Sequence, residues 1–169
     1  MPLDPYYRIY FHDQTYLDYN GDTEAMKAQM AQFSRRDANQ YDRFMKASRK
    51  IYEAVIPEKL GATPFMTLLS MARFAPRALA MGAILPTAWF ARRYFRDFRH
   101  IFAYSFHPLF IGGNPFRAPA IYEMIPYLEK LEGVWYTRGG MTRLIRALGD
   151  LFTELGGEIR TESEVKEIL

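Results

Sequence analysis

The sequence predicts an α+β fold that is mainly helical and carries one small antiparallel sheet. Near the start, aromatic residues alternate over 6–12 and recur over 15–19, which is typical of a β-hairpin. Apolar residues recur at three- and four-residue steps over 41–55 and 141–155, which is typical of amphipathic helices. Prolines divide the chain between these helices, so we expect short, broken helices there.

Composition excludes several classes of protein. The 169 residues are 49% hydrophobic, 24% charged and 16% aromatic, so the chain is a folding globular protein rather than a disordered one. The absence of cysteine excludes disulfides, thiolate zinc sites and cysteine nucleophiles. The three histidines are scattered in sequence, so no metal site is predicted. The motifs of nucleotide-binding loops, zinc proteases and serine hydrolases do not occur.

The first half of the chain is expected to form a hairpin and then helices. The hairpin spans 6–19, and we expect 134–136 to join the same sheet. A short helix follows over 23–33, and Ser34 then begins a longer helix that stops before Pro57. Another helix is expected from residues 63–64 onward, interrupted at Pro76 and Pro86.

The last third has the clearest helical pattern of the chain. A helix kinked at Pro126 is expected over 119–131, and an amphipathic one over 141–155 that stops at Gly156-Gly157. Residues 158–160 and 165–169 are expected to be strands of an incomplete sheet. Because unpaired strands leave backbone groups unsatisfied, we interpret the chain as a piece of a larger domain.

A basic and apolar segment lies between Phe65 and Phe110. It holds six arginines against the single acid Asp97, and no run is long enough to cross a bilayer. The start of the chain lacks the pattern of a secretory signal. Two interpretations stay open: a face that binds the membrane surface, or an ordinary solvated helix face. Nucleic acid is not expected as a partner, because no spacing typical of a nucleic-acid-binding module is present.

Three stretches resemble the bacterial and fungal phytoene desaturases of the carotenoid pathway. They are Phe106-His-Pro-Leu-Phe-Ile-Gly-Gly-Asn-Pro-Phe116, Gly133-Val-Trp-Tyr-Thr-Arg-Gly-Gly140 and the stretch from Leu151 to Ile159. The hairpin and the region over 30–44 are similar to the same family in the same order. The resemblance therefore extends over essentially the whole chain.

The resemblance implies an FAD enzyme that introduces double bonds into an apolar polyene by hydride transfer to the flavin. It implies a substrate-binding region over 1–139, with a helical membrane-facing insertion at about 64–107. It also implies that the helix and strands over 140–169 lead back into an FAD-binding domain that is incomplete here. The N-terminal dinucleotide-binding unit is not in this sequence, so the chain alone is not expected to hold FAD or to be active. The expected partners are the polyene, a membrane surface and the missing segments of the flavin domain.

Candidate site residues follow from these expectations. The residues expected to contact the polyene are Phe106, Phe110, Trp135 and Tyr136. A short buried strand would also account for the aromatic residues at positions 135 and 136. Val165 is expected at the adenine end of FAD. Those for the membrane are Arg73, Arg77, Trp89, Phe90, Arg92, Arg93 and Arg96. No catalytic base is named, because no carboxylate at a recognisable spacing orients His107; that histidine is expected to bond to backbone, and Asn114 to form a turn.

The predicted function is the substrate-binding portion of an FAD-dependent carotenoid desaturase, located in the cytoplasm at the membrane surface. The alternative is a non-catalytic module that binds lipid or carotenoid and derives from the same family. The sequence leaves both open.

Overall fold

The computed structural model describes residues 1–57 and 68–168, and the side chains of its fourth helix only from residue 75. The described chain divides into two units, Leu3–Val134 and Met1–Pro2 with Trp135–Leu169. The sequence placed its division between residues 139 and 140, inside the second of these. The helix start predicted at residues 63–64 lies outside the described residues.

The hairpin and the first helix form as predicted, but the second predicted helix is divided in two. Strand β1 (Tyr7–Tyr10) pairs antiparallel with β2 (Tyr16–Tyr19), with Ile9 opposite Leu17. Helix α1 (Thr23–Phe33) is capped by Asp22, whose side chain accepts from two backbone N–H groups. Ser34 caps α2 (Arg35–Ala38). The prediction of one longer helix here is wrong. The N–H of Gln40 donates to the carbonyl of Asp37, only three residues back, so the α-helical hydrogen-bond pattern is interrupted there. Helix α3 (Tyr41–Val55) then begins.

The proline-rich middle contains short helices, as predicted, but the two prolines act differently. Helix α4 (Leu68–Met81) continues through Pro76, so the prediction of a break there is wrong. Pro86 does mark a boundary, since it precedes α5 (Thr87–Arg92). Helix α6 (Phe98–Ala103) and the 3-10 helix η2 (His107–Ile111) follow.

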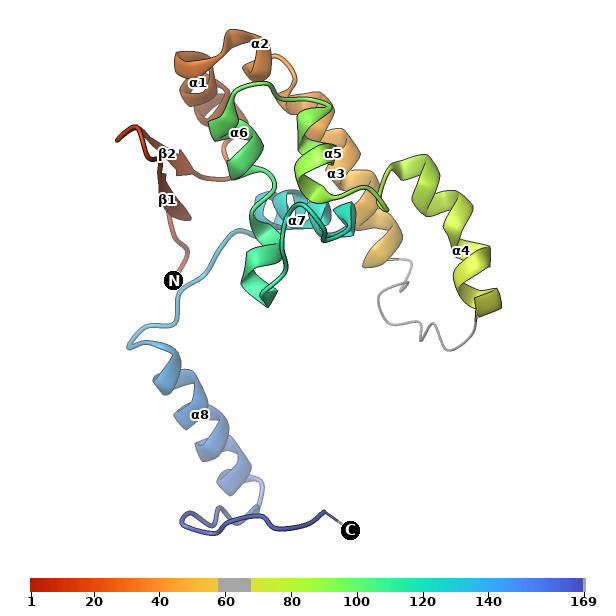
Figure 1. The fold of residues 1–169 in the computed structure, drawn as a ribbon. Helices are drawn as coiled ribbons and strands as arrows, with labels where there is room; N and C mark the ends of the chain where they lie inside the picture. Colours follow the sequence, from red (N-terminus) through yellow and green to blue (C-terminus); the bar gives the residue numbers. More distant parts are fainter. Residues whose placement is uncertain (58–67, 169) are drawn as a thin grey trace. The chain divides into compact units, whose positions relative to one another are not determined.

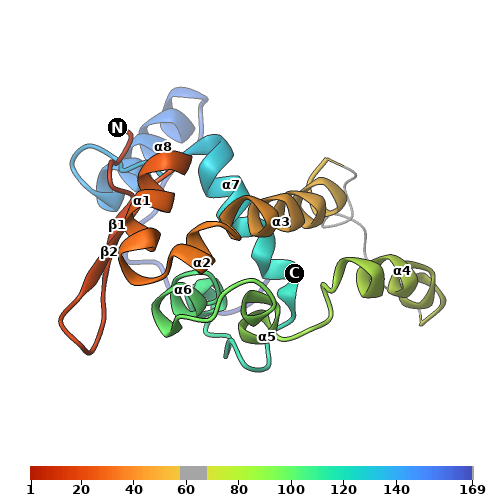
Figure 2. The same ribbon diagram turned by 90° about the horizontal axis from the view of Figure 1, so that it is seen from above.

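The next segment corrects two expectations. A 3-10 helix, η3 (Ala120–Glu123), precedes α7 (Met124–Glu132), which packs along α3 (Figure 2). Pro126 is the third residue of α7, where its missing N–H costs no hydrogen bond within that helix, so the helix predicted over 119–131 is instead divided at the end of η3. Residues 134–136 do not join the hairpin sheet; Val134 accepts from the N–H of Leu3, and Tyr136 pairs with Met1.

Helix α8 (Met141–Glu154) matches its predicted range (Figure 1). A left-handed Gly156 follows soon after its end. Its apolar face is exposed within the described residues. Residues 158–168 contain neither helix nor strand, so the strands predicted within them do not form. The reason is physical: a strand is stabilised by a paired ladder, and this unit has no described strand beside them.

The core of the larger unit is aromatic. Strand β2 packs against α1, and the rings of Phe95 and Tyr104, after α5, contact that of Phe44 on α3. Its largest fully buried members are Tyr104, Phe44, Phe90, Phe95, Leu17, Met26, Met30 and Ile51. Part of the aromatic load of the sequence therefore serves packing, while other described rings, such as Trp89, Phe102 and Phe116, stay exposed.

Candidate functional site

An apolar groove lies in the larger unit, beside α5, α6 and η2. It has a volume of about 410 Å³. Its lining residues are Ala88, Arg92, Phe98, Ile101, Phe102, Ser105, Phe106, Leu109, Pro115 and Phe116. Four phenyl rings and several aliphatic groups thus face a space with only two polar side chains at its edge, which suits a hydrocarbon ligand.

The walls of the groove are held by hydrogen bonds at the ends of its helices. The hydroxyl of Thr87, at the start of α5, donates to the carbonyl of Pro115 at 2.9 Å, and the N–H of Ala88 donates to the same oxygen at 3.1 Å. Asp97 caps α6 by accepting from the N–H of Arg99. Asn114 accepts from the N–H of Phe116, which confirms its predicted role as a turn former.

Of the four residues predicted to contact the polyene, the groove includes Phe106. Its ring stacks on that of Phe102, with centroids 6.1 Å apart and planes at 12°. Phe110 does not line the groove; it is 61% exposed and meets Phe106 edge-on. Trp135 and Tyr136 belong to the other unit, where both are exposed. Neither residue lies in a buried strand of the described structure.

The residues predicted to bind the membrane divide into exposed and buried ones. Trp89 is 59% exposed, whereas Phe90 beside it is fully buried against the ring of Phe44. The prediction for Phe90 is therefore wrong: its position on α5 faces the core. Arg93 lies near the Phe90 ring, and Arg92 lines the groove.

The remaining arginines of the predicted set lie elsewhere. Arg96 has an exposed side chain, and its backbone N–H is held by Asp37. Arg77 is exposed on α4. The side chain of Arg73, on the same helix, is outside the described part.

A buried carboxylate fixes the segment that carries Arg96. Asp37 accepts hydrogen bonds from the N–H groups of Arg96 and Asp97, each at 2.8 Å, and its other oxygen accepts from Arg36. Burial opposes its ionisation, but these N–H donors lower its pKa overall. His100 lies 3.1 Å away; burial lowers its pKa and outweighs the opposing effect of Asp37, so we expect a neutral imidazole.

A second buried carboxylate corrects the interpretation of His107. Glu129 accepts from the hydroxyl of Tyr7 at 3.1 Å and lies 3.3 Å from Nε2 of His107. Burial, followed by the charge of Glu129, raises the pKa of Tyr7. The histidine is buried as predicted, but its partner is a carboxylate and not the backbone. No sequence rule pairs residues 22 positions apart on different elements, so this contact was missed.

Glu123 is a buried carboxyl group with no hydrogen-bond partner for either oxygen among the described residues. Burial raises its pKa well above the ordinary 4.5, so the folded state favours the protonated form. The pKa of Glu123 is higher in the folded state than in the unfolded state. Its contribution to the free energy of unfolding is therefore complete below the unfolded-state pKa and is lost as pH rises through the folded-state pKa.

We therefore expect Glu123→Gln to be more stable than the parent chain at about pH 8, with the difference shrinking toward zero near pH 4. Urea unfolding of both proteins across this range measures the effect. A difference that stays constant with pH would contradict it.

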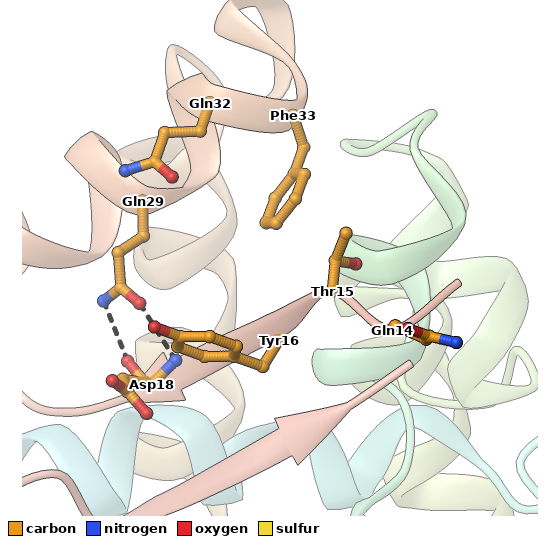
Figure 3. A pocket seen from close by; sticks show the side chains of 7 residues that line it. All are labelled: Gln14, Thr15, Tyr16, Asp18, Gln29, Gln32 and Phe33. Atoms are coloured by element: carbon orange, nitrogen blue, oxygen red, sulfur yellow. Dashed lines mark hydrogen bonds between the residues drawn. The ribbon is translucent and has the colours of Figure 1, made fainter. Parts of the chain in front are cut away.

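A second hollow, of about 480 Å³, lies between β2 and α1 (Figure 3). The amide of Gln29 accepts from the N–H of Asp18 and donates to its carbonyl, both at 2.9 Å, and so covers this edge of the strand. The carboxylate of Asp18 pairs with Arg8. This hollow is polar and unsuited to a hydrocarbon.

The described residues do not build a flavin site. Val165, expected at the adenine end of FAD, is 75% exposed and belongs to no helix or strand. The glycine turns at 139–140 and 156–157 flank α8 and do not follow a described strand, as a pyrophosphate-binding turn would. We therefore derive no chemical step through a flavin in this chain.

No helix among the described residues combines the length and the apolar character needed to cross a membrane. Those residues also contain no group of three or more acidic, histidine or cysteine side chains arranged to hold a metal ion.

Comparison with known proteins agrees with the resemblance seen in the sequence. A family model of flavin containing amine oxidoreductases matches residues 1–169. The chain is 36% identical to a lycopene-forming phytoene desaturase of Pseudescherichia vulneris, over all of this chain and 34% of the relative. It is also 36% identical to a neurosporene-forming phytoene desaturase of Cereibacter sphaeroides, over 99% of this chain and 32% of the relative.

A 4,4'-diapophytoene desaturase of a Methylomonas species is 28% identical over all of this chain and 33% of the relative. The chain thus spans about a third of the length of the curated relatives that it matches. Because the family model covers every residue, this chain belongs to the flavin containing amine oxidoreductases, and its relatives there include phytoene desaturases.

Proposed function

We propose that this chain is the substrate-binding portion of an FAD-dependent carotenoid desaturase and that the groove holds the polyene. The observation that carries the proposal is the lining of that groove, where four phenyl rings accompany only two polar side chains. A polyene has almost no polar group, so shape and ring contacts must orient it. The full-length flavoproteins of this family use FAD, which would accept the hydride and would be held by residues outside this chain.

Phe116→Ala tests the proposal, because this ring lines the groove yet is 60% exposed and adds little to the core. We expect the affinity for a detergent-dispersed phytoene-type polyene to fall about tenfold, from the loss of about 1.4 kcal/mol of apolar contact. Retention of the polyene by the purified chain during gel filtration, over a range of polyene concentrations, measures this.

The matched control is Tyr10→Ala, which removes an exposed ring from the hairpin, away from the groove residues. Equal losses in both variants, or none in either, would count against the groove as the polyene site.

We further propose that the groove opens at a membrane-binding surface. Exposed apolar side chains stand on the elements around it: Trp89, Phe102, Leu109, Phe110, Ile111 and Phe116. Arg92, Arg93 and Arg96 are exposed nearby in the chain, and α4 adds Arg77. Rings at the interface and arginines at anionic headgroups would let the protein collect a substrate dissolved in lipid.

The double variant Arg93→Gln/Arg96→Gln is expected to bind vesicles that contain phosphatidylglycerol about 30-fold more weakly. Each arginine near an anionic surface contributes about 1 kcal/mol. Vesicle sedimentation at low and high salt measures the binding. The control, Arg43→Gln/Lys46→Gln, removes the same charge from the exposed side of α3. Vesicle binding that does not depend on salt or on lipid charge would indicate that these arginines belong to an ordinary solvated helix face.

The exposed apolar face of α8 supports a third part of the proposal, namely that further segments of the flavin domain cover it. Its large apolar side chains are Met141, Leu144, Ile145, Leu148, Leu151 and Phe152, all exposed in the described structure. Such a stripe normally lies against a core.

The alternative function is a module that binds lipid or carotenoid without catalysis. The two functions differ in whether the polyene reduces a flavin held in the same polypeptide.

A further inference from the structure

The groove contains a feature that a neutral hydrocarbon does not need. Arg92 is the only charged side chain among the described residues that line it, and it is exposed. Within the described part of the chain, no acid pairs with this guanidinium. Other arginines do have such partners: Arg8 pairs with Asp18, Arg49 with Glu53, and Arg99 with Asp97.

An unpaired guanidinium beside an apolar space constrains the chemistry of a ligand. A polyene that fills the groove would remove water from part of Arg92 and offer no acceptor in return, which is unfavourable. An anionic group at the end of the hydrocarbon would provide the acceptor. A carboxylate fits best, because its two oxygens match the planar fork of the guanidinium.

We propose that the groove also binds long-chain carboxylates, with the hydrocarbon along the phenyl rings and the carboxylate on Arg92. The inference rests on the proposed function, since both use the same groove. It adds a second ligand class, one that competes with the polyene, and a residue that selects it.

The test uses the full chain and cis-parinaric acid, a fluorescent polyene fatty acid, at about pH 8 where its carboxyl group is ionised. The methyl ester of the same acid is the neutral probe. We expect the parent chain to bind the acid about fivefold more tightly than the ester, as for a partly exposed charge-assisted contact. Arg92→Gln is expected to equalise the two affinities, and Arg92→Lys to keep part of the preference.

The control variant is Arg43→Gln, an equal loss of charge on α3 outside the groove, which is expected to keep the full preference. Prior addition of a phytoene-type polyene is expected to reduce acid binding. Equal affinity of the parent chain for acid and ester would overturn the inference while leaving hydrocarbon binding, and so the proposed function, intact. Failure of both the acid and the ester to bind would overturn the inference and the proposed hydrocarbon-binding function together.

Two further outcomes would each overturn part of the inference. A preference for the acid that survives in Arg92→Gln would place the carboxylate elsewhere and overturn the role of Arg92. Binding seen only with phosphatidylglycerol vesicles, and never with the dispersed acid, would identify a lipid headgroup as the ligand and overturn the carboxylate.

Discussion

Replacing Asp37 by alanine is expected to lower the free energy of unfolding of the larger unit by about 3–5 kcal/mol. This carboxylate is fully buried, and it accepts from the N–H groups of Arg96 and Asp97, from Arg36, and lies at 3.1 Å from His100. Removing it leaves two backbone donors without an acceptor and deprives the buried imidazole of its partner. The loss also frees the segment after α5 that carries the exposed arginines.

Urea unfolding followed by far-ultraviolet circular dichroism measures this loss, with the fluorescence of Trp89, on α5 of the larger unit, to check that one transition describes it. Asp42→Ala is the control: its pair with Lys27 is largely exposed, so we expect a change below about 1 kcal/mol. If the two variants lose the same free energy of unfolding, the hydrogen bonds from Arg96 and Asp97 to the carboxylate of Asp37 do not hold that segment against α2.

Replacing Phe44 by alanine is expected to cost about 3–5 kcal/mol of stability. The ring is fully buried at the centre of the aromatic core, with centroids 4.9 Å from Tyr104 and 5.1 Å from Phe95. It also meets the edges of Phe90 and Tyr94. Because neighbours on α5 and after it cannot all move into the space, truncation loses both apolar burial and packing contacts.

The same unfolding measurement tests this second variant. Phe44→Leu retains much of the volume, so we expect a smaller loss. Phe102→Ala, on α6, removes a half-exposed ring and is expected to cost less than Phe44→Ala. A Phe44→Ala protein as stable as Phe102→Ala would mean that the aromatic cluster repacks freely and does not define the core.

Elements with strong local signals were predicted from the sequence to within a residue or two. The helix over 23–33 matches α1, and the one over 141–155 matches α8, because an N-cap, a C-terminal glycine and apolar periodicity act within a few residues. Single prolines were harder. Pro76 lies within α4 and Pro126 in the first turn of α7, and their effect depends on position in a helix whose start the sequence places only approximately.

The candidate site was predicted only in part. The resemblance points to Phe106 but not to the other rings of the groove, Phe98, Phe102 and Phe116, because α6 and the turn after η2 come together only in the folded chain. Phe90 was assigned to the surface because the segment is basic and apolar, yet periodicity alone does not tell a core face from a lipid face.

From the sequence alone one can determine the helical character, the hairpin, the family and the absence of cysteine chemistry, since each depends on composition or on neighbours along the chain. Tertiary structure decided which rings enter the core and which line the groove. It also brought Glu129 to His107 and Asp37 to the arginine segment. Such contacts join side chains to other side chains or to backbone groups 22 to 60 residues away, and their energy comes from shared burial, which no local pattern records.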